Sequence, residues 1–237
     1  MKWLIYSELA RSRKSAVLSV IFAVLAVGIF VLIALSLNYG NLGKLPIEAK
    51  ESFFDMNNSV SVPLIAIISG FIVDAAIDAS REDNLCYRWF RRSTPISPLK
   101  YSAVNVIIIS LYFIIGLGLA FGLSAVVLAV SGLEFTAEHA AAIFFCIEVV
   151  LMMNVIMTIF QASLHVSKDK AGIMMITMFC IPMFLIFLIT EGTAFEISQE
   201  DITGFFLKLF PFSPLIILGL LAACLLLTAA GIKRREK

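Results

Sequence analysis

The stretch SAVLSVIFAVLAVGIFVLIALSL, residues 15–37, contains no charged residue. A helix of about 20 apolar residues is needed to cross the hydrocarbon core of a bilayer, which is roughly 30 Å thick. Ala34-Leu35-Ser36 resembles the small-x-small site of a secretory signal, but the apolar core of such a signal is typically only about 7 to 15 residues long. The length of the stretch therefore predicts a retained transmembrane helix.

Apolar runs of similar length fill most of the remaining chain. Hydrophobic residues make up 60% of the sequence and charged residues 15%, whereas soluble domains have roughly 45 to 50% and 25%. The sequence predicts an all-α membrane protein with one domain, residues 1–237, and six transmembrane helices. The predicted spans are residues 16–37, 60–79, 103–130, 140–165, 171–190 and 214–232.

The basic residues are distributed asymmetrically between the segments that join these spans. With six spans, fifteen of the 18 Lys and Arg residues fall on one side of the membrane, and nine acidic residues fall on the other. Short cytoplasmic loops carry an excess of Lys and Arg. We therefore expect both termini to be cytoplasmic.

The segment MKWLIYSELARSRK, residues 1–14, precedes the first span. One helical face would carry Trp3, Tyr6 and Leu9. Another would carry Glu8, Arg11 and Lys14. Such a segregation of side chains is typical of an amphipathic helix that lies in the membrane interface, although a plain basic flank would also contain these residues.

The segment before the third span combines aromatic and basic residues. It reads YRWFRRSTPISPLKY, residues 87–101. Ser80 and Asp83 resemble a capping box, and Pro95 disfavours helical geometry at Thr94, so a short helix is predicted over about 80–93. Its apolar face would hold Leu85, Cys86, Trp89 and Phe90. Asn84, Arg88 and Arg91 would lie opposite, with Arg81 and Arg92 alongside. Such a helix could lie among lipid headgroups or dock into a groove of a soluble partner.

The context of this segment resembles one protein family. Acidic residues at the end of the second span (Asp78, Glu82 and Asp83), an amphipathic turn and STPISPLKY at the start of the third span resemble the small permeases of type 2 ABC exporters. The six-span layout, the SELARSRK leader and the IKRREK tail are also similar to that family. The resemblance is greatest to the compact branch that includes exporters of phenol-soluble modulins and pumps that confer immunity to peptide antibiotics.

The resemblance implies a bacterial cytoplasmic membrane, a cytoplasmic ABC ATPase as partner and a second permease copy or homologue. The implied ATPase-coupling residues are Glu82, Asp83, Leu85, Arg88, Trp89, Phe90, Arg91 and Arg92. The chain has no G-x-x-x-x-G-K-[ST] phosphate loop, so ATP and Mg would be held by the separate ATPase. No catalytic residue and no cofactor are expected in this chain. The alternative function is a non-transporting membrane subunit for immunity or assembly.

Polar residues inside the predicted spans are candidates for function, because a charge at mid-membrane costs about 2.5 to 3.5 kcal/mol on insertion scales. Glu148, about a third of the way into the fourth span, and Asn154 are candidates for a substrate pathway, with a packing role as the alternative. Asp74 and Asp78 are candidates for a structural ion pair or for coupling. Intramembrane aspartyl proteases need two facing carboxylates, whereas these two aspartates lie on one predicted helix.

Other features of the sequence are less specific. The four cysteines show no C-x-x-C spacing, so neither a disulfide nor a metal site is predicted. Gly118 and Gly122 form a G-x-x-x-G pattern with Gly116 nearby, which permits close helix packing. The net charge is +1, and no nucleic-acid partner is expected.

Overall fold

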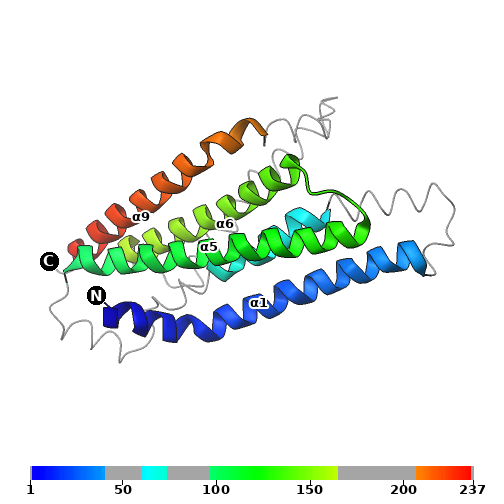
Figure 1. Ribbon diagram of the computed structural model, residues 1–237. Coiled ribbons are helices and arrows are strands. Elements are labelled where there is room, and N and C mark those ends of the chain that lie inside the picture. The colour runs from blue at the N-terminus through cyan, green and yellow to red at the C-terminus, as the bar shows by residue number, and fades with distance from the viewer. Residues whose placement is uncertain (1, 41–59, 74–96, 165–206, 236–237) are drawn as a thin grey trace, which may run out of the picture. The chain divides into compact units, whose positions relative to one another are not determined.

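The computed structural model describes residues 2–40, 60–73, 97–164 and 207–235, and the regular elements in these ranges are all helical (Figure 1). The helix Val60–Val73 ends in a 3-10 turn, η2. The elements are α1 (Lys2–Tyr39), η2 (Phe71–Val73), α5 (Pro98–Ser131), α6 (Ala137–Leu164), η3 (Phe210–Phe212) and α9 (Ser213–Arg235).

Four segments of the described chain are long and apolar enough to cross a membrane. They are Ser12–Tyr39, Pro98–Ser131, Ala137–Ile159 and Leu207–Gly231. The prediction of a helical, multi-pass membrane protein is thus supported. The second predicted span is described only as the helix Val60–Val73, and the fifth, residues 171–190, lies outside the described residues. The six-span count and the cytoplasmic position of the termini stay predictions.

The first and last of these helices expose large apolar side chains over most of their circumference. In the most apolar 18-residue stretch of α1 only 11% of the residues are buried, and the share is the same in α9. In α6 it is 44%. Leu32 on α1 and Leu218 on α9 are each 67% exposed. Contiguous apolar surface of this kind is costly in water and is suited to lipid. The acyl chains of a bilayer would therefore cover α1 and α9.

The described helices belong to two units of internal contact. The first unit contains α1, Val60–Val73 and residues 107–151, which include the end of α5 and the start of α6. The second unit contains residues 98–106, 152–164 and 207–235. Both α5 and α6 therefore contribute one part to each unit.

In the first unit, α1 and α5 run in parallel (Figure 1). Near the start of α1, the hydroxyl groups of Ser12 and Tyr112 form a hydrogen bond. Fifteen residues further along both helices, Val27 packs in one apolar cluster with Val127, together with Phe30. Two contacts with the same spacing on each helix fix both the direction and the register of the pair.

The hydrogen bond near the start of α1 has a defined direction. Ser12 donates its hydroxyl hydrogen to the carbonyl of Leu9, with 3.1 Å between the oxygens. Tyr112 must therefore be the donor to Ser12 Oγ. Interhelical hydrogen bonds in membranes contribute about 0.6 kcal/mol on average, so this bond fixes register more than it adds stability.

We expect a double-mutant cycle of Ser12→Ala and Tyr112→Phe to give a coupling free energy of about 0.6 kcal/mol, and not more than about 1.7 kcal/mol. The readout is reversible unfolding of the purified chain in detergent. Tyr39→Phe is the matched control, because Tyr39 lies at the other end of α1 and is exposed. Additive single effects, with no coupling, would contradict the bond.

The helix Val60–Val73 approaches α5 and α6 closely through glycines. A Cβ atom added at Gly116 of α5 would lie 2.9 Å from the backbone oxygen of Ser69 and 2.9 Å from Cγ2 of Ile72. A Cβ added at Gly70 would lie 3.2 Å from Cβ of Val150 on α6. The absence of a side chain at these two glycines therefore lets the short helix pack against both long ones.

The end of α5 is a Schellman motif. The N–H of Leu133 donates to the carbonyl of Leu128 at 2.9 Å, and the N–H of Gly132 donates to that of Ala129 at 3.2 Å. Gly132 has φ +75°, a left-handed conformation that glycine adopts without steric cost. The motif ends α5 and leaves a short connection to α6.

The start of α6 is capped by a histidine side chain. The N–H of Thr136 donates to Nδ1 of His139 at 3.2 Å, which is the contact that Glu or Gln makes in a capping box. The ring of Phe135 lies 5.9 Å from that of His139 and 5.7 Å from that of Phe121. Phe121 also meets Phe144 edge-on at 5.6 Å, so aromatic packing joins the connection to both helices.

The second unit has a different polar pattern. On α6, the hydroxyl of Thr158 donates to the carbonyl of Asn154 at 2.9 Å. On α9, the buried side carries small or weakly polar residues, including Ser213, Cys224 and Thr228. A 3-10 turn, η3, containing Pro211 precedes α9.

Candidate functional site

The structure describes only part of the predicted site. Asp74 and Asp78, and all eight predicted ATPase-coupling residues, lie outside the described residues. The coupling residues are Glu82, Asp83, Leu85, Arg88, Trp89, Phe90, Arg91 and Arg92. Their assignment stays a prediction. The two pathway candidates, Glu148 and Asn154, both lie on α6.

Glu148 is a buried carboxylate in the middle of an apolar helix. It lies eleven residues after the start of α6 (Ala137–Leu164), well inside the apolar segment Ala137–Ile159. Its side chain is only 7% exposed, and the neighbouring Ile147 and Leu151 are fully buried. Ionisable residues at this depth are rare and are associated with substrate or ion pathways. Glu148 is therefore the strongest functional candidate among the described residues.

The phase of α6 determines which side of the helix carries Glu148. Val150 contacts the helix Val60–Val73 at Gly70, and Phe144 contacts Phe121 of α5. Residues four apart share one face of a helix, whereas residues two apart lie about 200° from each other. Glu148 therefore lies on the side of Phe144, toward α5, and roughly opposite the tight contact at Gly70.

Asn154 occupies a different position on α6. Its side chain is buried, and its backbone carbonyl accepts the hydrogen bond from Thr158. Six residues separate it from Glu148, which places the two side chains about 120° apart around the helix and about 9 Å apart along it. The two candidates therefore do not form one cluster. Asn154 suits a packing role, because buried amides commonly bond to neighbouring helices.

Other buried polar groups were not predicted from the sequence. Ser69 and Ser124 are buried in the first unit, and their hydroxyl groups have no hydrogen-bond partner among the described residues. Their spacing in the sequence carried no signal, because serine is common in transmembrane helices. These hydroxyls give the interior of the first unit hydrogen-bonding capacity that its helices do not use.

The prediction for the N-terminal segment was wrong in one respect. The segment is not a separate interfacial helix but the first turns of α1, which continues unbroken from Lys2 to Tyr39. Glu8, predicted to lie on the charged face, is only 1% exposed, and Leu4 and Ser12 are buried with it. Positions 4, 8 and 12 share one helical face, and the packing of Ser12 against Tyr112 turns that face inward.

The described residues contain no group of three or more His, Cys, Asp or Glu side chains that could hold a metal ion. The described part of the site contains one buried carboxylate on α6, that of Glu148. Such a group can bind a cation or a hydrogen-bond donor. Comparisons of the chain with protein-family models, with curated proteins and with solved structures find no match.

Proposed function

We propose that the chain is the membrane-spanning permease subunit of an ATP-driven exporter of the type 2 ABC class. A separate ATPase subunit would bind ATP and Mg on the cytoplasmic side. The substrate would be hydrophobic or amphipathic, such as a peptide, and a second copy or a homologue would complete the pathway. The family resemblance of residues 78–101 is the origin of this proposal.

The start of α5 is the observation that carries the proposal. The third span was predicted to begin near residue 103, but α5 begins at Pro98, directly after STPIS. The N–H of Tyr101 donates to the carbonyl of Ser97 at 3.2 Å, and the side chains of Tyr101 and Ser102 are buried. The start of α5 is thus fixed by packing at Tyr101 and Ser102. In the proposal, a displacement of the coupling segment would be transmitted to this end of α5.

Glu148 gives the proposal a substrate contact. A carboxylate within the membrane would stabilise the passage of an amine or guanidinium through spans whose other buried polar groups, among the described residues, are uncharged. An amphipathic peptide with basic side chains has both properties that the bundle favours. The proposed cargo is therefore apolar on one side and cationic on the other.

The first test is affinity purification of the tagged chain from its native membranes in mild detergent, followed by mass spectrometry. We expect an ATPase with a phosphate loop to copurify. Its reproducible absence would contradict the exporter proposal and favour a membrane subunit that functions without ATP. Any second permease recovered would identify the paired homologue.

The double variant Trp89→Ala/Arg91→Ala tests the coupling segment. Because aromatic and Arg side chains dominate docking interfaces, we expect at least about tenfold less ATPase to be recovered, with unchanged insertion of the chain. Phe212→Ala/Lys208→Ala is the matched control, since it removes one exposed aromatic and one exposed basic residue before α9. Undiminished recovery with the first variant would exclude our choice of coupling residues.

A further inference from the structure

The first turns of α1 extend beyond the part of the helix that crosses the membrane. The apolar segment of α1 begins at Ser12, whereas the helix begins at Lys2. Ten helical residues span about 15 Å. The polar layer on each side of the hydrocarbon core is about 5 to 8 Å thick, so these turns pass through the depth of the lipid headgroups.

These turns have one buried face, formed by Leu4, Glu8 and Ser12. The bond from Tyr112 to Ser12 attaches this face to α5. The orientation of the whole segment is therefore set by packing, and the opposite face is held outward.

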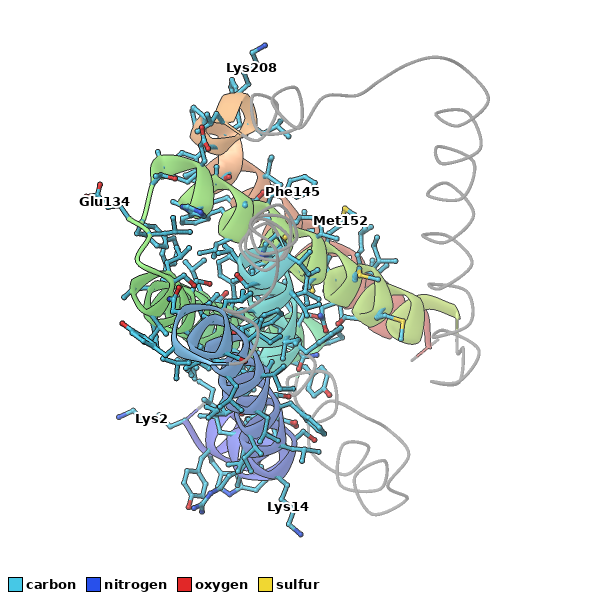
Figure 2. All side chains as sticks on the ribbon, turned by 90° about the vertical axis from the view of Figure 1, so that its right-hand side faces the viewer. Lys2, Lys14, Glu134, Phe145, Met152 and Lys208 are labelled. Atoms are coloured by element: carbon cyan, nitrogen blue, oxygen red, sulfur yellow. The ribbon has the colours of Figure 1, made fainter. Side chains whose placement is uncertain are left out.

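The opposite face, which we call the N-terminal basic face, consists of Lys2, Trp3, Tyr6, Arg13 and Lys14. At about 100° per residue, these five positions centre roughly opposite the buried face. Trp3 is 59% exposed and Tyr6 is 73% exposed, and the three basic residues are exposed as well. Figure 2 shows Lys2 and Lys14 extending away from the helix.

The burial of Glu8 determines the charge that this segment exposes. Glu8 is the only acidic residue in the sequence before Glu48. Because it lies on the buried face, the N-terminal basic face presents three positive charges and no negative one.

We propose that the N-terminal basic face binds the headgroups of anionic phospholipids. Lys and Arg side chains near a membrane surface attract anionic lipids, and Arg can bond to a phosphate group with two parallel N–H donors. Trp and Tyr rings favour the depth of the headgroups because each has an apolar body and a polar tip. This binding surface is independent of the proposed transport function.

Fluorescence quenching of Trp3 tests this proposal. The chain contains two tryptophans, so Trp89→Phe leaves Trp3 as the only one. The purified chain is reconstituted into phosphatidylcholine vesicles that contain equal fractions of phosphatidylglycerol, with either lipid brominated near the glycerol end of its acyl chains. We expect brominated phosphatidylglycerol to quench Trp3 more strongly, and high salt to reduce the difference.

Variants of the basic residues should weaken this selectivity. We expect Lys2→Gln, Arg13→Gln and Lys14→Gln each to lower the relative binding constant for phosphatidylglycerol by up to about fivefold. Lys208→Gln, which removes an exposed lysine outside this face, should leave it unchanged. The salt titration of the unsubstituted basic face provides a second readout if a variant folds poorly.

Two outcomes would overturn the proposal. Equal quenching by the two brominated lipids, at low and at high salt, would show that the face does not select anionic headgroups. Absence of quenching by either lipid would show that Trp3 does not lie at the membrane surface.

Discussion

Gly116→Leu is expected to lower the free energy of unfolding by more than about 3 kcal/mol, because overpacking a close helix contact typically costs 1 to 3 kcal/mol even for small additions. A Cβ atom at this position would already lie 2.9 Å from the backbone oxygen of Ser69. A backbone atom cannot move aside by changing rotamer, so the helix Val60–Val73 would have to shift as a whole. Gly116→Ala should show a smaller loss in the same direction.

Gly118 supplies the matched control for this substitution. It lies two residues further along α5, and nothing comes within 4 Å of a Cβ atom added there. Gly118→Leu should be neutral or stabilising, since replacing glycine within a helix gains roughly 0.5 to 1 kcal/mol. Unfolding in detergent, followed by circular dichroism, compares the two variants. Equal stability of the Gly116→Leu and Gly118→Leu chains would contradict the close contact.

The contrast between these glycines shows where sequence patterns lose information. The G-x-x-x-G spacing singled out Gly118 and Gly122, yet both are exposed, and Gly116 makes the close contact. Spacing indicates which small residues share a helical face. It does not indicate which face has a neighbour, because that depends on the register between α5 and Val60–Val73.

The boundaries of the helices were also predicted in part. Apolar runs located the cores of α1, α5, α6 and α9, because hydrocarbon allows few charges along a span. The helices themselves begin earlier, at Lys2 for α1 and Pro98 for α5. Their extra turns contain polar residues and are stabilised by packing against other helices. The length of an apolar run gives no information about such packing.

The side chain of Glu8 illustrates the same limit at the level of a single residue. Its charge and its neighbours Arg11 and Lys14 favoured an exposed position. The structure buries it because Leu4 and Ser12 on the same face pack inward. Position 8 follows the phase of the helix and not the preference of its own side chain. By contrast, Glu148 stands in an uninterrupted apolar run, so the sequence did single it out as a candidate, although it did not indicate which way its side chain points.

Glu148→Gln is expected to leave the fold intact and to reduce the transport of a cationic amphipathic peptide about 10- to 100-fold, which corresponds to the 1.5 to 3 kcal/mol of a hydrogen bond to a charged group. Glutamine keeps the size and the hydrogen-bonding capacity of the side chain but removes its charge. The measurement is ATP-dependent uptake into inverted vesicles that contain the chain and its ATPase. A neutral amphipathic peptide should be transported equally by both forms.

Three comparisons distinguish a substrate contact from a packing role for Glu148. Glu138→Gln, at the exposed start of α6, is the control for a general effect of charge and should transport normally. Glu148→Leu should lose cationic transport as the glutamine variant does, because it too lacks the charge. If Glu148→Gln transports the cationic peptide normally while Glu148→Leu unfolds, the carboxylate serves packing alone. That result would leave the exporter proposal open but would contradict a cationic cargo. No other acidic side chain among the described residues is buried within the membrane-spanning helices.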